Sequence, residues 1–292
     1  MQLESLKVFC DLAETESFTK TARVNGVTQS AVSQTVTAME KQFKALLIER
    51  SKKNFRLTPE GEVVYNHSKR ILHTFGALES KIQGIKGDLA GSIRVATVGS
   101  IGLYDLPPYI KRFLKDYPTV NVRVEYRRAD EVYDEVLSNG VDLGLVAFPV
   151  RDARLETIPF RSDRLVLVCH PENGLAKQKA IKLKSLEGLK FVGFDLDIPT
   201  RKALDKFFKD QGIAVEYVMQ FDNIEMVKRA VEIDTGIAIL PEETVKAELA
   251  TKSLAAVPLE GNYSRQLAVI HKKDKILSPA MKKFIELLKK AL

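Results

Sequence analysis

The sequence of 292 residues lacks the features that mark disulfide-rich, metal-binding, secreted and membrane proteins. Its two cysteines, Cys10 and Cys169, cannot build a disulfide framework, and its four scattered histidines match no common metal-site spacing. No apolar run approaches the roughly 18 residues that span a bilayer, and the N-terminus lacks the order of a secretory signal. We therefore expect a cytoplasmic protein with no metal, no cofactor and no membrane segment.

Motifs of common enzymes are also missing. The sequence has no glycine-rich phosphate loop, no Gly-x-Ser-x-Gly turn and no histidine-containing metal motif. Ser100 has no base placed beside it by the sequence, and His67 and His73 lie on an expected linker helix. We therefore assign no catalytic residue and expect a protein that is not an enzyme.

What the sequence does have is a concentrated positive charge within a net charge of +7. Residues 41–56 hold six basic side chains against Glu49 alone. Such a cluster attracts phosphates because bound Lys and Arg release the counterions of a duplex, although a solvated surface is the alternative. The six are Lys41, Lys44, Arg50, Lys52, Lys53 and Arg56. They frame residues 54–57, which predict one strand of a small hairpin, or wing.

The first 58 residues predict three short helices. Ser17 is the expected N-cap of the second helix, which ends at Asn25 and Gly26. Thr28 is the expected cap of a third helix over 29–40. On that helix a set of apolar residues recurs at spacings of 4, 3 and 4 and should pack inward. The set is Val32, Val36, Met39 and Phe43.

The outer face of the third helix is polar but uncharged, which is unusual. A solvated helix normally carries Lys and Glu on its outside. Base recognition in a major groove requires polar side chains such as Gln and Ser. They lie on a helix that follows another helix and a turn, which here contains glycine. A polar helix without a ligand is the alternative. We predict DNA contacts from Thr28, Gln29, Ser30, Ser33, Gln34 and Thr37, and phosphate contacts from Arg50, Lys52, Lys53 and Arg56.

Residues 59–90 predict one long helix, because Thr58 and Pro59 suit its start. Six apolar residues, from Ile71 to Leu89, recur at spacings of 4, 3, 4, 3 and 4, which is a narrow heptad seam. A narrow seam favours pairing with a second such helix, and packing on the protein's own body is the alternative. The predicted dimer contacts are Ile71, Phe75, Leu78, Ile82 and Ile85.

The remainder alternates strands and helices, which predicts an α/β fold with mostly parallel sheets in two similar lobes. Expected strands cover 92–98, 120–126, 141–146, 164–169, 191–194, 215–221, 235–240 and 266–271. Expected helices cover 107–116, 130–139, 199–211, 224–233 and 279–292.

Three stretches, in this order and spacing, resemble the LysR-type transcriptional regulators. They lie at 17–22, 27–33 and 56–61, and the resemblance extends over the whole chain. It implies a winged helix-turn-helix, a dimerising linker helix and an effector domain of two lobes like periplasmic binding proteins. Members typically bind an interrupted inverted repeat of double-stranded DNA, often as tetramers.

The resemblance and the patterns together predict an all-α N-terminal module followed by an α/β domain. The winged helix-turn-helix takes 1–58, the linker helix 59–90 and the effector domain 91–292. Lobe I takes 91–162 and 266–292, and lobe II takes 163–265. The chain should cross between the lobes near 160–163 and near 263–266.

Three residues depart from the family pattern. Gln34 stands where many members carry Arg, and its amide suits adenine better than guanine. Asn25 occupies a turn position often held by Leu, and Val24 is expected to supply the apolar contact instead. Ile48 replaces a common Phe, which a core tolerates.

The effector site is expected at the carboxyl ends of strands, where helix N-termini supply free N–H groups. Ser100 and Ile101 follow the first strand, and Ser100 either donates to a ligand or only caps its helix. Arg128 or Arg201 would pair with an anionic effector, with a surface ion pair as the alternative. The resemblance adds Arg128, Phe148, Thr200, Arg201 and Asn223 to the predicted site.

The leading hypothesis is a sequence-specific DNA-binding transcriptional regulator that a small anionic metabolite controls. It would act as a homodimer or a homotetramer. A small-molecule-binding protein without DNA binding and an enzyme on an α/β scaffold are the alternatives.

Overall fold

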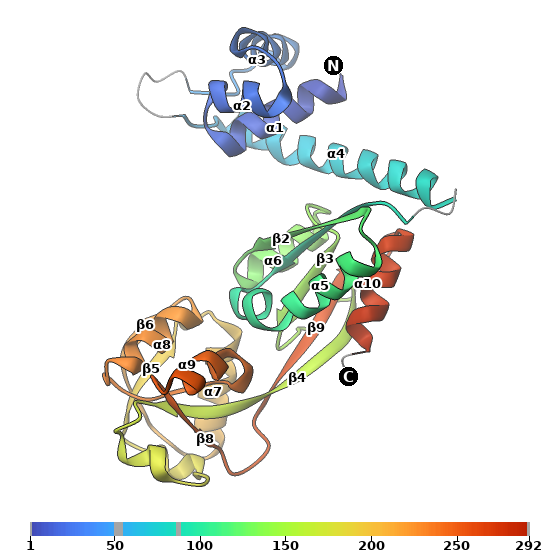
Figure 1. Cartoon of the computed structure of the whole chain (residues 1–292). Helices are drawn as coiled ribbons and strands as arrows, with labels where there is room; N and C mark the ends of the chain where they lie inside the picture. Colours follow the sequence, from blue (N-terminus) through green and yellow to red (C-terminus); the bar gives the residue numbers. More distant parts are fainter. Residues whose placement is uncertain (1, 50–54, 86–88, 291–292) are drawn as a thin grey trace. The chain divides into compact units, whose positions relative to one another are not determined.

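The structure is a computed structural model, and it describes residues 2–49, 55–85 and 89–290 (Figure 1). The chain divides into two compact units. The first is Met1–Gly91 with Ser138–Gly140, and the second is Ser92–Leu137 with Val141–Leu292. Within the described ranges, none of the helices combines the length and the apolar character needed to cross a membrane.

The first unit packs three short helices around one apolar core. Val32, Val36 and Met39 are buried there beside Phe9, as their spacing predicts. The prediction for Phe43 is wrong, since this side chain is 42% exposed. It is the last helical residue before Lys44 turns the chain, so it lies past the packed segment. The helices are α1 (Leu3–Thr15), α2 (Phe18–Asn25) and α3 (Gln29–Phe43).

Local hydrogen bonds begin α2 and α3 at the predicted caps and end α2 at the predicted turn, whereas α3 continues to Phe43, beyond the predicted 29–40. The side chain of Ser17 accepts from the backbone N–H of Lys20, and that of Thr28 accepts from the N–H of Ala31 at 3.2 Å. Gly26 ends α2 with φ at +65°, a conformation that glycine adopts without steric cost.

Asn25 joins α1 to α2 by hydrogen bonds rather than by apolar contact. Its amide donates to the carboxylate of Asp11 at 2.8 Å and to the carbonyl of Thr21, and its oxygen accepts from Lys7. Val24 does not take over the apolar contact, because 62% of it is exposed. The expectation for Val24 is therefore wrong, and polar bonds stabilise this turn instead.

A short antiparallel bridge lies at the base of the predicted wing. Ile48 pairs with Leu57, and the N–H of Glu49 donates to the carbonyl of Arg56 at 2.9 Å. Ile48 is buried in the core of the first unit, as expected for the departure from Phe. Residues 50–54, which include Arg50, Lys52 and Lys53, lie outside the described residues.

The long helix α4 (Pro59–Ile85) starts at the predicted cap. The hydroxyl of Thr58 accepts from the N–H of Gly61 at 3.0 Å. A Cβ at Gly61 would lie 2.1 Å from the carbonyl oxygen of Leu47, so only glycine lets the helix start this close to the chain before the wing.

The second unit contains one sheet of seven strands and one of two (Figure 1). The large sheet has the order β2-β1-β3-β9-β4-β7, with β8 also paired to β4, and the small sheet pairs β5 with β6. The strands are β1 (Gly91–Thr97), β2 (Val120–Tyr126), β3 (Leu143–Ala147), β4 (Leu155–Cys169), β5 (Lys190–Phe194), β6 (Glu216–Phe221), β7 (Ala238–Pro241), β8 (Ala255–Pro258) and β9 (Ser264–Lys272).

Helices flank these strands. Longer helices are α5 (Pro107–Asp116), α6 (Ala129–Leu137), α7 (Pro199–Asp210), α8 (Ile224–Glu232), α9 (Lys246–Thr251) and α10 (Pro279–Lys289). Three of those in the described residues, α5, α7 and α10, begin at a proline that suits the first helical position. Single-turn helices are η1 (Ile101–Asp105), η2 (Gly174–Lys177), η3 (Leu183–Leu186) and η4 (Glu242–Val245).

The strand β4 connects the two lobes. It pairs with β9 in lobe I as far as Arg164 opposite Ser264, and with β7 and β8 in lobe II from Leu165 and Val166 onward. The change of partner lies beside the expected crossings. The sequence predicted only the lobe II half of β4, because its lobe I half has no continuous apolar run and contains Pro159.

The expectation of mostly parallel sheets is wrong. Among the pairings with a described register, β1–β3 and β5–β6 are parallel, whereas β3–β9, β4–β7, β4–β8 and β4–β9 are antiparallel. The described pairings of β4 with β7, β8 and β9 are all antiparallel, and they account for most of the antiparallel pairs.

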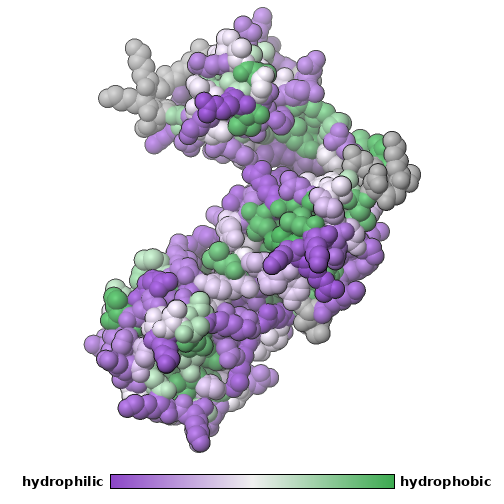
Figure 2. Space-filling model, in the orientation of Figure 1, coloured by the Kyte–Doolittle hydropathy of each residue, from purple (hydrophilic) through white to green (hydrophobic). Residues whose placement is uncertain are grey.

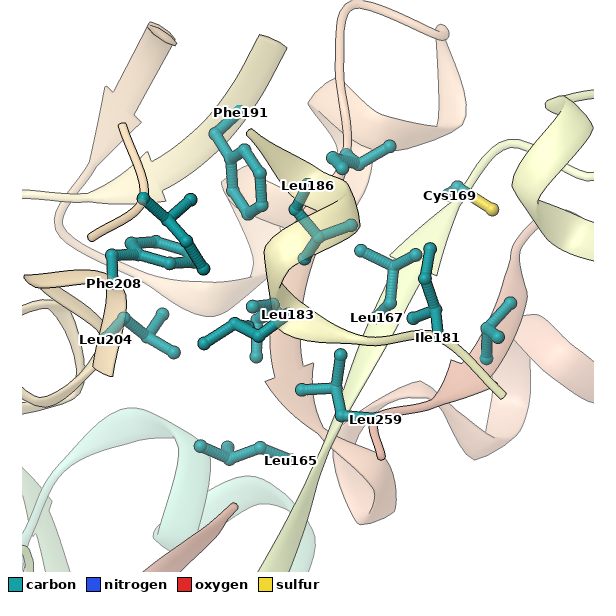
Figure 3. Packing of buried hydrophobic residues seen from close by; sticks show 14 residues of the cluster. Leu165, Leu167, Cys169, Ile181, Leu183, Leu186, Phe191, Leu204, Phe208 and Leu259 are labelled. Carbon is teal, nitrogen blue, oxygen red and sulfur yellow. The ribbon is translucent and has the colours of Figure 1, made fainter. Parts of the chain in front are cut away.

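Lobe II has a continuous apolar core on one side of β4 (Figure 3). Leu165, Leu167 and Cys169 project from β4 into it, and Phe191 meets Phe208 edge to face with ring centroids 5.4 Å apart. Such interdigitated packing gives the lobe a fixed shape. The ends of its strands and helices therefore present side chains in defined positions.

Candidate functional site

The outer face of α3 is exposed and largely without internal partners. Gln29, Ser33, Gln34 and Thr37 are exposed, and within the described residues their side chains make no hydrogen bond. Thr28 and Ser30 are exposed too, but their hydroxyls lie 2.9 Å apart and Thr28 also caps the helix. The face therefore offers amide and hydroxyl groups that can bond to another molecule without breaking a bond within the chain.

Basic side chains lie close to this face along the chain. Lys41 and Lys44 are exposed at the end of α3, and Arg56 is exposed beside the bridge at the wing. The predicted contacts Arg50, Lys52 and Lys53 fall outside the described residues. Lys41, Lys44 and Arg56 can bind the phosphates of a duplex, and such contacts do not depend on the base sequence.

The apolar seam of α4 is exposed in the single chain. Ile71, Phe75, Leu78 and Ile82 are between 40% and 52% exposed. Figure 2 shows hydrophobic residues gathered along α4. The side chain of Ile85 lies outside the described part of the chain. Four large apolar side chains on one stripe of a helix are typical of an interaction surface.

A cavity of about 390 Å³ lies between the two lobes of the second unit. This size suits a small metabolite. Its apolar wall includes Val98, Leu103, Ala147, Phe194, Ile198 and Ile224. Its polar lining includes Ser100, Arg127, Arg128, Glu131, Thr200, Asp222, Asn223, Glu225 and Arg265. We call this cavity the cleft.

Ser100 lies in the cleft wall contributed by lobe I. Its hydroxyl oxygen accepts from Nη1 of Arg265 at 2.8 Å, and it makes no capping bond to the short helix η1. An acceptor hydroxyl still has its own proton to donate. Ser100 therefore does not cap η1, and its hydroxyl proton is available to another group.

The start of α7 lies in the cleft wall contributed by lobe II. Pro199 and Thr200 line the cavity, and the residue before them, Ile198, has no side chain that can cap the helix. Thr200 is only 6% exposed, and its hydroxyl has no hydrogen-bond partner among the described residues. Uncapped N–H groups and a free hydroxyl at a helix N-terminus together favour an anion.

Arg128 is placed at the cleft but already has partners. Its guanidinium forms a close ion pair with Asp197 and lies 3.9 Å from Asp222, and both carboxylates belong to lobe II. The hydrogen bond to Asp197 raises the pKa of Arg128. Asn223 likewise caps α8 by accepting from the N–H of Met226. Both predicted residues line the cleft, and Arg128 links its two sides.

Two family profiles together match nearly the whole chain. Residues 3–62 match the profile described as bacterial regulatory helix-turn-helix protein, lysR family, and residues 86–292 match the LysR substrate binding domain. The chain belongs to the LysR family. A curated relative of this LysR chain, the RuBisCO operon transcriptional regulator of Allochromatium vinosum, is 30% identical over 287 residues, which cover 98% of this chain and 95% of the relative.

Solved structures of LysR proteins share the fold. The full-length regulator CbnR in complex with its target DNA superposes with a TM-score of 0.77 and 21% identity, covering 100% of both chains. The regulatory domain of Synechocystis CcmR in complex with 2-PG has a TM-score of 0.63 and 22% identity, and covers 68% of this chain and 96% of that one. These likenesses confirm the predicted fold class.

Three of the predicted effector contacts do not line the cleft. Ile101 is fully buried in the protein core, where its apolar side chain is removed from water. Phe148 is half-buried beyond β3 with φ at +50°, which turns the chain at the strand end. Arg201 points into lobe II rather than into the cleft. The structure therefore places these three predicted contacts away from the lining of the cleft.

The partners of Arg201 explain its position. Its Nη1 donates to the carbonyl of Phe194 at 2.7 Å and to Gln220 at 2.6 Å, and its Nε lies 2.9 Å from Asp205. Its guanidinium carbon lies 3.5 Å from the centre of the Tyr217 ring. A cation with this many internal partners stabilises lobe II and is not available to a ligand.

Sequence reasoning missed Arg265 in the cleft. Arg265 pairs in register with Asp163, and opposite charges at the two predicted crossings were the signal that could have revealed it.

Sequence reasoning also missed a bond between the lobes. The hydroxyl of Tyr104 bonds closely to Glu225 and accepts from Lys228 at 2.5 Å. Lys228 is 1% exposed and also contacts Glu248 at 2.8 Å. Burial lowers the pKa of Lys228, but its hydrogen bonds outweigh that effect and the net shift is upward. The hydrogen bond from this buried cation therefore connects Tyr104 of lobe I to lobe II.

The described residues hold no group of His, Cys, Asp and Glu side chains that suits a metal ion. Cys169 is buried, and burial raises the pKa of its thiol to about 11. A thiol that stays protonated at neutral pH is a poor nucleophile.

Proposed function

We propose that this chain is a sequence-specific DNA-binding transcriptional regulator that acts as a homodimer and responds to a small anionic metabolite in the cleft. One observation carries the DNA-binding part. The exposed outer face of α3 presents amides and hydroxyls without internal partners, next to basic side chains. This combination supports base recognition over a polar helix that only faces solvent.

The residue types on α3 also indicate how bases would be read. A glutamine amide donates one hydrogen bond and accepts another, which matches the N6 and N7 edge of adenine. Gln34 stands on this face without an internal partner among the described residues. We therefore propose that the operator half-site contains an adenine opposite Gln34.

A dimer follows from the exposed seam on α4. Pairing the seams of two chains would bury Ile71, Phe75, Leu78 and Ile82, which a single chain leaves exposed. A dimer reads two half-sites at once, in agreement with an interrupted inverted repeat. We propose that α4 forms this contact.

The DNA-binding proposal is tested by incubating the protein with sheared genomic DNA and sequencing the retained fragments. The expected result is enrichment of a few sites that share an interrupted inverted repeat. Fragments retained without any shared sequence, at an affinity that depends only on salt, would contradict base recognition.

The cleft favours an anion for two reasons. The N-terminus of α7 is uncapped beside the free hydroxyl of Thr200, and the hydroxyl proton of Ser100 is available on the opposite lobe. A related regulatory domain, that of CcmR, binds 2-PG. A ligand that touches both lobes would alter the angle between them, and it can act only if it binds one arrangement better than the other.

The effector proposal is tested by calorimetry with 2-PG first and then with a panel of small carboxylates and phosphates. At least one anion should bind, and its presence should change the DNase footprint on the identified operator. Neutral compounds binding in place of every anion tested would contradict the anionic assignment.

A further inference from the structure

A cluster of five charged side chains lies where β4 and β9 cross between the lobes. We call Asp105, Arg161, Asp163, Glu243 and Arg265 the hinge cluster. Arg265 Nη2 lies 2.6 Å from Asp163, Arg161 Nε lies 3.2 Å from the other oxygen of Asp163, and Arg161 Nη2 lies 2.7 Å from Glu243. The cluster ties η1 of lobe I to η4 of lobe II.

Asp105 is the poorly satisfied member of this cluster. Its side chain is fully buried, and neither carboxyl oxygen has a hydrogen-bond partner. The nearest cations, Arg161 and Arg265, each lie 3.6 Å away. One oxygen of Asp163 also lacks a hydrogen bond. An ionised carboxylate that is buried without hydrogen bonds is strongly disfavoured. Asp163 accepts hydrogen bonds from Arg265, so Asp105 is the group better suited to be a carboxylic acid.

The charge balance leads to the same conclusion. Three carboxylates face two guanidinium groups, which leaves one excess negative charge when all five groups are ionised. Lys246 contacts Glu243 at 2.7 Å, but 65% of its side chain is exposed, so water screens its charge. A proton on one buried carboxylate removes the excess.

The pKa of Asp105 agrees with this picture. Burial, followed by the negative charge of Asp163, raises the pKa of Asp105 to about 7, although Arg265 and Arg161 oppose the shift. The charged groups that face Asp105 come from β4 (Arg161 and Asp163), β9 (Arg265) and η4 (Glu243).

We propose that the hinge cluster is a proton-binding site in which Asp105, the buried carboxyl group with no hydrogen-bond partner, carries a proton. With the proton the cluster is neutral, and without it the cluster carries one negative charge. The site therefore makes the connection between the lobes sensitive to pH.

The proton also affects the cleft, a step that rests on the proposed anionic effector. Arg265 is shared between the hinge cluster and Ser100, whose hydroxyl lines the cleft. Loss of the proton adds a negative charge behind Arg265, so an anion in the cleft should bind less tightly as the pH rises. For one linked proton, the affinity falls by at most about tenfold per pH unit.

Infrared spectroscopy of the full-length protein tests the proton directly. A protonated carboxyl group has a C=O stretching band separate from those of carboxylates and of histidine. The wild-type protein should show this band at about pH 6 and lose it by about pH 9. No such band at pH 6 would overturn the proposal, and this measurement needs no variant.

Variants identify the group. Asp105→Asn should abolish the band, whereas Asp163→Asn should only weaken it at pH 6, because the charge of Asp163 is the second cause, after burial, of the raised pKa of Asp105. Asp152→Asn is the matched control, because hydrogen bonds from Arg154 lower the pKa of Asp152 to about 2 and its carboxyl is ionised throughout this pH range. A band that persists in Asp105→Asn would place the proton elsewhere and contradict the assignment.

A second measurement separates the coupling from the site. Sulfate keeps a constant charge across this range, so its affinity is measured by calorimetry at about pH 6.5 and 8.5. The wild type should bind it several-fold more weakly at the higher pH, and Asp105→Asn should show no difference. A pH-independent affinity in the wild type would overturn the coupling. If the carboxyl band is present but no anion binds at either pH, the proton site stands and the proposed effector class is contradicted.

Discussion

The outer face of α3 and the wall of the cleft differ in how many of their polar side chains already have partners. On α3, Gln29, Ser33, Gln34 and Thr37 are exposed and form no hydrogen bond among the described residues. In the cleft, Arg128 is paired with Asp197, and Ser100 accepts from Arg265. Thr200 of the cleft resembles the α3 residues, since its hydroxyl has no hydrogen-bond partner in the part of the chain that the structure describes.

The difference predicts two kinds of binding. A face with free polar groups can bind another molecule without breaking bonds inside the chain, so the cost of binding there is the ordering and desolvation of its own side chains. A cleft whose charges are paired across two lobes must exchange internal bonds for bonds to the ligand. Binding there is therefore coupled to the arrangement of the lobes, which is what a sensor requires.

The largest expected effect concerns the proposed dimer, in which α4 brings two α3 faces to the DNA together. Replacing Leu78 and Ile82 with Glu would place unpaired charges in the proposed seam, at a cost of several kcal/mol. Sedimentation should show loss of the dimer, and operator affinity should fall with it. The control Asn66→Glu with Arg70→Glu adds the same residues to α4 off the seam and should remain dimeric. A dimeric seam variant would contradict the role of α4.

The next effect concerns the paired groups at the hinge. The pKa of Asp105 is about 7 in the folded chain against a usual 3.8, so its contribution to stability is fully present below about pH 4 and lost as the pH rises through 7. The loss is on the order of 4 kcal/mol.

Denaturation with urea at a series of pH values measures this loss. As the pH rises from about 4 to about 8, the free energy of unfolding of the wild type should fall relative to that of Asp105→Asn, because the variant has no carboxyl group to ionise at this position. Asp152→Asn should keep a constant difference from the wild type over the same range, because the lowered pKa of Asp152 acts only at more acid pH. A constant difference for Asp105→Asn as well would contradict a raised pKa of Asp105 in the folded chain.

A moderate effect tests the free groups of α3. Gln34→Ala, Gln29→Ala or Ser33→Ala should each weaken operator binding by about 1–3 kcal/mol and leave random DNA unaffected. Gln42→Ala changes an exposed glutamine on another side of α3 and should have no effect. Lys52→Ala or Arg56→Ala should weaken all sequences alike and flatten the salt dependence. Competition binding measures the discrimination between operator and random DNA. If every α3 variant discriminated as well as the wild type, base recognition by α3 would be contradicted.

The smallest expected effect lies in the cleft. Ser100→Ala and Thr200→Val each remove one hydrogen bond to the effector, worth about 1–2 kcal/mol, while folding and basal DNA binding stay near the wild type. Calorimetry with the identified effector measures the loss, and Ser185→Ala, an exposed serine outside the cleft lining, is the control. Unchanged affinity in both cleft variants would place the ligand elsewhere.

Much of the first unit could be predicted from the sequence because its signals are local. The caps at Ser17 and Thr28, the turn at Gly26 and the exposed face of α3 each depend on residues within a few positions of one another. Helical spacing decides which side chains share a face, so the sequence alone separated Val32 and Met39 from Gln29 and Gln34. It failed for Phe43 at the helix end, where packing decides exposure.

The cleft depended on tertiary structure, because its residues are far apart in the chain. Ser100 and Arg265 are 165 positions apart, yet a hydrogen bond joins them. The sequence placed Arg201 at the start of a helix beside the cleft, but only the packing of α7 on β5 and β6 turned its guanidinium inward. A long charged side chain binds whichever partners its surroundings supply. Composition and periodicity thus determined the module types, and three-dimensional pairing decided which charges stayed free for a ligand.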